Sequence, residues 1–142
     1  MNLDDLLPHV LKKNVIAHIE DTTLYIHNRK RYPFVDETVP CTTVEQIAQA
    51  LRGMVTQGGG VLQVALRAMI FIAILMQERI IECSYEKFKE QGLIVVNARV
   101  TNTTARRVFS TIIESLEEHP EVIHQYDIVN HITSLVQQTE DH

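Results

Sequence analysis

The sequence is short of the features that mark several specialised classes of protein. It has two cysteines, Cys41 and Cys83, in 142 residues and no C-x-x-C pair, which is too few for a disulfide scaffold. We expect two reduced, partly buried thiols. With 13 Lys and Arg against 18 Asp and Glu, the chain lacks the excess positive charge that nucleic-acid binding requires. Acidic Asp4 and Asp5 stand where a signal peptide would be basic, so we expect a cytoplasmic protein.

A long hydrophobic run is also missing, although one segment comes close. Val61–Met76 is strongly apolar, but its 16 residues are fewer than the ~20 needed to cross a bilayer. A central, almost fully buried helix explains this segment better than a membrane span. Gln63 and Arg67 lie four residues apart on one face of it. We expect hydrogen bonds within the chain to satisfy this pair, and contact with a partner chain is the alternative.

The first part of the chain predicts a small antiparallel sheet within a single domain, 1–142, whose length suffices to bury a core. In the sheet region 15–41, a two-residue turn at Asp21-Thr22 would place two facing pairs on one side of a hairpin. These pairs are Ile19 with Leu24 and Ala17 with Ile26. The extended run Tyr32–Cys41 contains Pro40 and is expected to be a third, edge strand. Residues 2–14 have the apolar spacing of a helix.

The region 43–138 is expected to be helical, because its apolar period changes from two to about 3.6. Thr43 and Gln46 form a capping box at the start of a helix that reaches about Val55. Further helices are expected at 61–76, from Ser84 to Lys89 with Gly92 closing it, from Thr101 or Thr103 to about Glu118, and from Pro120 onward. Leu93–Val96 is ambiguous between strand and helix. The expected fold class is α+β: a small antiparallel N-terminal sheet of two to three strands, followed by a helical bundle.

Three consecutive glycines are the most suggestive local signal. Gly58, Gly59 and Gly60 stand between two predicted helices, where they let the backbone approach a ligand closely. The helix that follows offers free N–H groups and the positive end of its dipole, a combination that suits a phosphate. Glycine after a helix is also an ordinary stop signal, so both interpretations stay open.

The order of motifs around these glycines resembles the N-terminal domain of the methylthioribose-1-phosphate isomerase family. That family has a D-Q-R-K-L-P-like turn, a threonine-capped helix with an A-I-R-x-M-V pattern, an R-G-A-P-A-I-G junction and a later R-P-T-A-V-N motif. The matching segments here are Asn28–Pro33, Thr43–Glu45, Ala50–Val55, Gln57–Gly60 and Ala98–Thr103. Regulatory subunits of initiation factor 2B and ribose-bisphosphate isomerases share this architecture.

The resemblance implies which residues would bind a ligand. In the isomerases, the arginine-glycine loop and the R-P-T arginine contribute to a phosphosugar site. The corresponding ligand-binding candidates are Gln57, Gly58, Gly59, Gly60, Arg99 and Thr101. Gln57 replaces an arginine that would make a charge-assisted, bidentate phosphate contact. The catalytic cysteine and aspartate of the family come from a C-terminal Rossmann-like domain that we do not expect here, and neither Cys41 nor Cys83 matches the context of that cysteine.

The sequence therefore predicts a non-catalytic binding or assembly module. Its expected contacts are self-association or a partner protein chain, with no catalytic residue, cofactor, nucleic acid or membrane. One component of a split sugar-phosphate isomerase and a sensor of a phosphorylated small molecule are the alternatives, and both would bind a phosphorylated ligand. If another chain packs on Val61–Met76, an apolar surface is expected there.

The remaining polar candidates have simpler interpretations. The histidines considered lack H-x-x-x-H spacing, so we expect solvated imidazoles and no metal site. They are His18, His27, His119, His124 and His131. Arg52 is expected to be a solvated or capping charge at the end of its helix.

Overall fold

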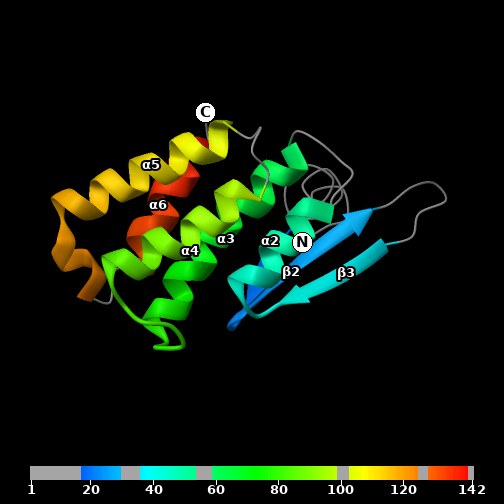
Figure 1. The fold of residues 1–142 in the computed structure, drawn as a ribbon, viewed down its shortest axis with the longest axis horizontal. Helices are drawn as coiled ribbons and strands as arrows, with labels where there is room; N and C mark the ends of the chain where they lie inside the picture. The colour runs from blue at the N-terminus through cyan, green and yellow to red at the C-terminus, as the bar shows by residue number, and fades with distance from the viewer. Residues whose placement is uncertain (1–16, 30–35, 54–58, 99–102, 125–127, 141–142) are drawn as a thin grey trace, which may run out of the picture.

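The computed structural model describes residues 17–29, 36–53, 59–98, 103–124 and 128–140. Strands β1 (Ala17–Glu20), β2 (Thr23–Arg29) and β3 (Asp36–Cys41) form an antiparallel sheet in the order β1-β2-β3. The helical elements that follow are α2 (Val44–Gly53), α3 (Gly59–Gln77), α4 (Tyr85–Asn97), α5 (Thr103–Glu118), the 3-10 helix η2 (Pro120–His124) and α6 (Ile128–Glu140). Figure 1 shows the sheet at one end of the molecule and α3 to α6 packed together at the other, with α2 between them. The predicted α+β class is confirmed.

The hairpin has the predicted register. Ile19 pairs with Leu24 and Ala17 with Ile26, on either side of a turn at Asp21-Thr22. Asp21 has a φ of 53°, a left-handed conformation that aspartate tolerates better than most residues. The third strand was also predicted correctly over Asp36–Cys41, and Pro40 lies within this edge strand opposite Tyr25. Residues 32–35 and the helix predicted at 2–14 lie outside the described residues.

The capping box of α2 is present as predicted. The backbone N–H of Gln46 donates to Thr43 Oγ1 over 3.2 Å, and Gln46 Oε1 accepts from the N–H of Thr43 over 3.3 Å. Gln46 Oε1 also accepts from the N–H of Thr42 over 2.7 Å. These bonds satisfy N–H groups that a helix start leaves without partners. Arg52 is exposed in the last turn, as expected for a charge at the end of the helix.

The central helix α3 is almost completely buried. From Val64 to Met76, every residue except Arg67 and Ile74 is buried, and α3 contacts β1, β2, α2, α4, α5 and α6. The apolar surface expected over Val61–Met76 is therefore not found from residue 64 onward, because the chain's own elements cover it. No helix within the described ranges is both long enough and apolar enough to span a membrane.

The hydrogen bonding of the polar pair on α3, Gln63 and Arg67, differs from the prediction. Gln63 Oε1 is buried and accepts no hydrogen bond from the described residues, whereas we expected hydrogen bonds within the chain to satisfy both members of the pair. Arg67 does interact with the rest of the molecule. A buried acceptor without a donor costs about 1–3 kcal/mol, so Gln63 is an unfavourable position in an otherwise well-packed helix.

Two helix boundaries differ from the sequence prediction. Gly92 does not close the helix that Ser84 caps, since α4 continues through it to Asn97, and this settles Leu93–Val96 as helical. Gly92 packs against α5 there and does not act as a stop signal. The helix predicted from Pro120 is two elements, η2 and then α6 from Ile128. Thr103 is the first residue of α5, while Thr101, the other predicted cap, is outside the described part.

Candidate functional site

Two of the six predicted ligand-binding residues lie within the described part of the chain. Gly59 and Gly60 are the first two residues of α3, so this helix begins within the glycine run and not after it, as the sequence had predicted. Gln57, Gly58, Arg99 and Thr101 lie outside the described residues, so their role stays a prediction.

The helices that flank these residues are arranged around one end of the helical bundle. In Figure 1, α3 and α5 begin, and α2 and α4 end, toward the same side of the helical part. Helices α3, α4 and α5 contact one another, and α2 contacts α3 and α4. Arg106 Nη2 in the first turn of α5 donates to Asn97 Oδ1 at the end of α4 over 2.9 Å. Two helix N-termini therefore face the same side, and each carries a partial positive charge.

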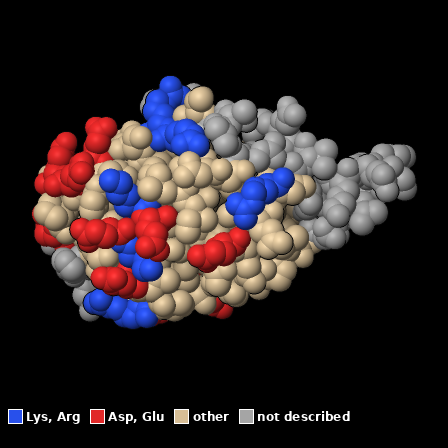
Figure 2. All heavy atoms as spheres, viewed as in Figure 1, with Lys and Arg blue, Asp and Glu red and all other residues tan. Residues whose placement is uncertain are grey.

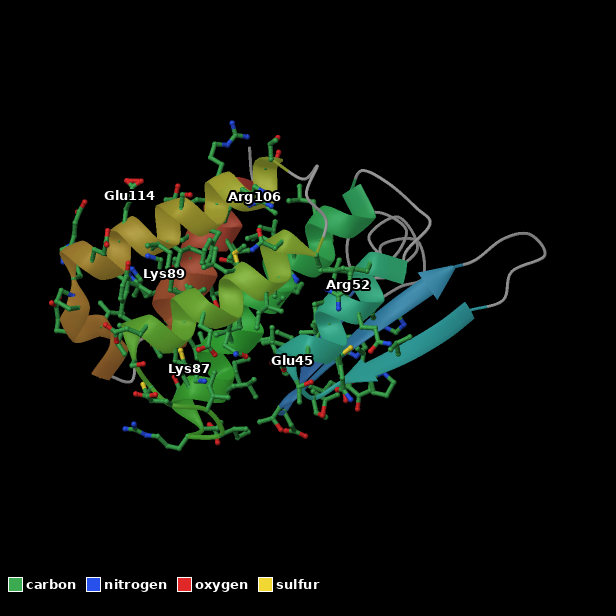
Figure 3. The ribbon with its side chains drawn as sticks, viewed as in Figure 1. Glu45, Arg52, Lys87, Lys89, Arg106 and Glu114 are labelled. Carbon is green, nitrogen blue, oxygen red and sulfur yellow. The ribbon has the colours of Figure 1, made fainter. Side chains whose placement is uncertain are left out.

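A groove of about 400 Å³ lies between α4 and α5. Its floor is apolar, and polar side chains stand around it. The lining residues are Leu93, Val96, Phe109 and Ile113 on the floor, with Lys89, Arg106, Ser110 and Glu114 around them. Lys89, Arg106 and Glu114 are labelled in Figure 3, along the two helices that form the groove. The volume is within the range of ordinary ligand pockets.

One side chain of the groove is unusual for its exposure. Leu93 is 38% exposed, and the other large exposed hydrophobic side chain in the described part is Ile80 at 55%. Ile80 follows the end of α3 and does not line the groove. A leucine that is open to solvent beside three other apolar side chains is a surface that gains free energy when it is covered.

The charges around the groove are not neutralised by other described residues. Neither Lys89 nor Glu114 has an ion pair or hydrogen bond in the part of the chain that the structure describes, and Arg106 has an amide oxygen as its partner, not a carboxylate. By contrast, Lys87 on the neighbouring face of α4 pairs with Glu90 over 3.1 Å. The hydrogen bond from Lys87, and a second one from Gln91, hold the pKa of Glu90 below its ordinary value. The groove charges thus remain available to a partner.

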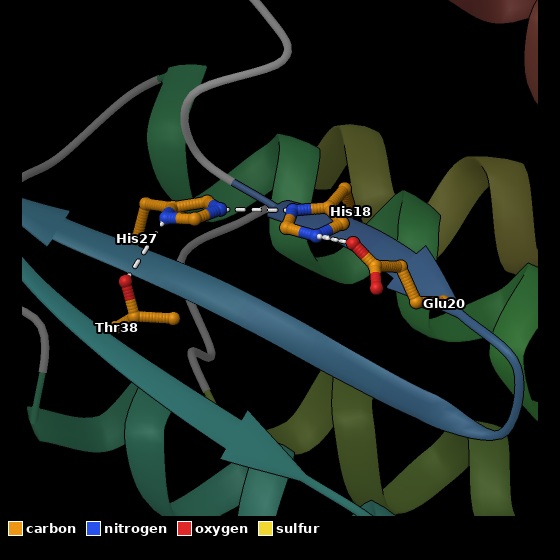
Figure 4. A network of polar contacts seen from close by, with 4 residues as sticks. All are labelled: His18, Glu20, His27 and Thr38. Carbon is orange, nitrogen blue, oxygen red and sulfur yellow. Dashed lines mark hydrogen bonds and ion pairs between the residues drawn. The ribbon is translucent and has the colours of Figure 1, made fainter.

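A polar network crosses the outer face of the sheet, and it was not predicted. Figure 4 shows His18 and His27 side by side, with 2.8 Å between Nδ1 of His18 and Nε2 of His27. His18 Nε2 lies 3.1 Å from Glu20 Oε1, and His27 Nδ1 lies 3.3 Å from Thr38 Oγ1. One set of neutral tautomers satisfies all three contacts: Thr38 donates to His27, His27 to His18, and His18 to Glu20. The network joins β1, β2 and β3 through their side chains.

The expectation of solvated imidazoles is therefore wrong for several histidines. His18 also stacks on Tyr25, with 5.1 Å between ring centroids. His131 Nε2 lies 2.7 Å from Ser115 Oγ between α5 and α6. His119 is exposed, with Nδ1 at 3.6 Å from Glu121 Oε2. Within the described ranges, no three His, Cys, Asp or Glu side chains are placed to hold a metal ion.

Both cysteines are free, as predicted, and both are packed. Cys41 has no exposed surface, and burial raises the pKa of its thiol above the ordinary value. Cys83 Sγ donates to the backbone carbonyl of Ile123 over 3.0 Å. A thiol that is buried or already hydrogen-bonded to a carbonyl is a poor nucleophile, because the thiolate is the reactive form.

Two features of these surfaces could have been found from the sequence. The predicted hairpin register already places His18 opposite Tyr25 and diagonal to His27 on the polar face. On α4, Lys89, Leu93 and Val96 follow helical spacing, as do Arg106, Ser110 and Glu114 on α5. What the spacing does not reveal is that these two faces lie beside each other.

The comparisons with known proteins give one informative match. The chain is 30% identical over 81 residues to a methylthioribose-1-phosphate isomerase from Sulfurimonas denitrificans. The match covers 57% of this chain and 21% of the isomerase, so the matched region is about a fifth of that protein's length. No protein-family profile matches the sequence, and no solved structure is significantly similar. The similarity supports a distant relationship between this chain and a methylthioribose-1-phosphate isomerase.

Proposed function

We propose that this chain is a binding or assembly module, derived from the N-terminal domain of methylthioribose-1-phosphate isomerases, that docks a protein chain in the groove between α4 and α5. The observation that carries the proposal is the composition of the groove. Four apolar side chains, among them the exposed Leu93, form its floor, and unpaired charges on Lys89 and Glu114 flank them. An apolar centre with a polar rim is the usual anatomy of a protein interface.

The packing of the described residues favours binding over catalysis by this chain. The thiol of Cys41 is buried in the core and that of Cys83 is bonded to a backbone carbonyl, so neither has the character of a catalytic nucleophile or proton carrier. The charged groups of the groove stand beside apolar side chains at an open surface. Such an arrangement suits recognition of another surface.

The second candidate is phosphosugar binding, as one component of a split isomerase or as a sensor. Two observations favour it: α3 and α5 begin on the same side of the helical bundle, and the chain is similar to an isomerase of a phosphorylated sugar. In addition, Gln63 Oε1, four residues into α3 from Gly59, is a buried acceptor that has no donor among the described residues. A sugar hydroxyl could supply that donor, while the helix N-termini would receive the phosphate.

Light scattering of the purified chain on a sizing column tests the docking proposal. We expect an assembled species whose mass falls when Leu93 is changed to Glu, because a charge on the groove floor opposes burial. Ile80→Glu is the matched control, since Ile80 is exposed outside the groove and its substitution should leave the mass unchanged. A chain that is monomeric at its highest soluble concentration would contradict the proposal.

Calorimetric titration with ribose phosphate tests the second candidate. Binding that is lost in Arg99→Ala would support a phosphosugar site at the helix ends. The absence of heat, with both the original chain and the variant folded by circular dichroism, would remove that candidate.

A further inference from the structure

The charged side chains of α5 are distributed in the order opposite to the one that its helix dipole favours. Arg106 and Arg107 lie in its N-terminal half, and Glu114, Glu117 and Glu118 lie in its C-terminal half. Figure 2 shows positive charge over the beginning of α5 and negative charge over its end, along one edge of the molecule. The helix dipole favours the opposite order, with acids at the N-terminus and bases at the C-terminus. The arrangement therefore does not serve the stability of α5 by itself.

These charges also do not pair along their own helix. Ion pairs on a helix join residues three or four positions apart. Ser110 lies four residues after Arg106 and four residues before Glu114, so it occupies the position where either would find an intrahelical partner. Within the described part of the chain, Glu114 and Arg107 have no side-chain partner. Both signs of charge are thus presented outward from α5.

The spacing is symmetric about the middle of the helix. Arg106 and Glu114 are equally far from Ser110, which lies at the centre of the 16 residues of α5. If a second α5 lies antiparallel to the first and crosses it at Ser110, Arg106 of each copy faces Glu114 of the other. A two-fold axis produces both contacts from the same residues, which is the defining property of an isologous interface. The small, exposed side chain of Ser110 at the crossing point permits close approach.

We infer that the α4–α5 groove is a two-fold interface with a second copy of this chain, in which the two α5 helices run antiparallel and each Arg106 pairs with Glu114 of the other copy. The inference rests on the proposed docking function and specifies its partner. The partner's α5 covers Leu93, which is 38% exposed in the isolated chain, and Ile113, which is partly buried. Glu114 then lies between Lys89 of its own chain and Arg106 of the other copy.

The size of this face sets the strength of association. A 16-residue helix is about 24 Å long, and two packed helices are roughly 20 Å wide. Two such faces bury roughly 1,000 Å² in total, which is at the lower limit for a stable interface. The dimer should therefore depend on concentration, and reversing a single charge should be enough to dissociate it.

Two charge-reversal variants, measured alone and then mixed, test the pairing of Arg106 with Glu114 of the other copy. Arg106→Glu gives a chain with acids at both positions, and Glu114→Arg gives a chain with bases at both, so each variant alone repels its own copy. Light scattering should show each variant as a monomer at concentrations where the original chain is a dimer. Mixed in equal amounts, the two variants should form a heterodimer, because every acid then meets a base. The double variant, carrying both changes, should dimerise by itself.

Matched controls separate specific pairing from a change in net charge. Arg52→Glu and Glu45→Arg make the same charge changes on α2, outside the groove, and should leave the dimer intact. Ser110→Cys should form a disulfide between copies rapidly under mild oxidation, because the two cysteines would meet at the axis. Gln49→Cys, at an exposed position on α2, should crosslink far more slowly.

The outcomes distinguish this inference from the proposed function. An assembly that is dissociated by Leu93→Glu but unaffected by either charge reversal would overturn the two-fold register while supporting docking at the groove. A monomer under all conditions would overturn both. Equal crosslinking of Ser110→Cys and Gln49→Cys would also overturn the two-fold register.

Discussion

The backbone of Gly92 in α4 lies against the ring of Phe109 in α5 with no room for a side chain between them. A Cβ atom on Gly92 would overlap Phe109 Cε1 and would come within 2.8 Å of both Cδ1 and Cζ. The same ring stacks on Phe88, with 6.2 Å between the centroids. Because Phe109 forms part of the groove floor, this contact sets how closely α4 and α5 approach and how deep the groove is.

Gly92→Ala should destabilise the protein, although alanine favours helix more than glycine does. The overlap with Phe109 forces α4 and α5 apart, and overpacking of this kind costs about 1–3 kcal/mol. Against this, alanine gains about 1 kcal/mol in helix propensity. We expect a net loss in the free energy of unfolding, measured by urea denaturation.

Gly53→Ala is the control for this prediction, because a Cβ there meets nothing within 4 Å. It should leave stability unchanged or slightly higher. Adding Phe109→Leu to Gly92→Ala should recover part of the loss, since the smaller side chain vacates the space. A Gly92→Ala protein as stable as the original would show that the α4–α5 contact yields easily.

Local features of this fold were predictable and long-range ones were not. The hairpin register follows from alternation around Asp21-Thr22, and the start of α2 follows from Thr43 and Gln46, because each depends on residues close in sequence. The interpretation of Gly92 as a helix stop was wrong. The ring of Phe109, 17 positions away in sequence, leaves no room for a side chain at position 92, and this contact explains the glycine. The groove was not predicted for the same reason: it exists only where two separate helix faces meet.

The capping box of α2 should contribute measurably to stability. Thr43→Ala removes the acceptor for the N–H of Gln46, and the loss of such a cap costs about 0.5–2 kcal/mol. Thr43→Ser retains the hydroxyl and should be close to the original protein. In a double-mutant cycle with Gln46→Ala, the two losses should be less than additive, because both residues serve the same helix end. Strict additivity would contradict the reciprocal bonding, and Gln49→Ala on the exposed face serves as the control.

Tyr85 should make stability depend on pH in the alkaline range. Burial, the hydrogen bond to Glu117 (2.9 Å) and the negative charges of Glu117 and Glu86 raise the pKa of Tyr85. An unfolded tyrosine releases its proton near pH 10, so above that pH the unfolded chain loses the proton first. Stability is therefore present below about pH 10 and decreases as the pH rises through the folded-state pKa.

The measurement combines a tyrosinate absorbance titration with urea denaturation at a series of alkaline pH values. The difference between the original chain and Tyr85→Phe isolates this residue among the four tyrosines. Its pKa should lie above that of a free tyrosine, and Glu117→Gln should lower it by removing the charge. Tyr85 titrating at or below the value for the unfolded chain would refute the assignment.

The two cysteines should differ in their reaction with a thiol reagent. Cys41 has no exposed surface, and burial raises its pKa, so both access and thiolate fraction are reduced. Cys83 is half-buried near the end of the loop before α4, where its Sγ donates to the backbone carbonyl of Ile123. We expect iodoacetamide to modify Cys83 first, and to modify Cys41 only as fast as the protein unfolds, because that side chain reacts only after the sheet and α2 separate.

Mass spectrometry of Cys83→Ser and Cys41→Ser chains, each with one thiol left, reads the two rates separately. The rate for Cys41 should increase in urea in parallel with the unfolded fraction, whereas the rate for Cys83 should rise at lower urea, when η2 loosens. The result also bears on the split-isomerase alternative. A proton-transferring thiol has to be accessible in the folded protein, so rapid native labelling of Cys41 would contradict its burial and would make this residue a catalytic candidate. Slow native labelling of Cys41 would mean that this residue is not such a thiol.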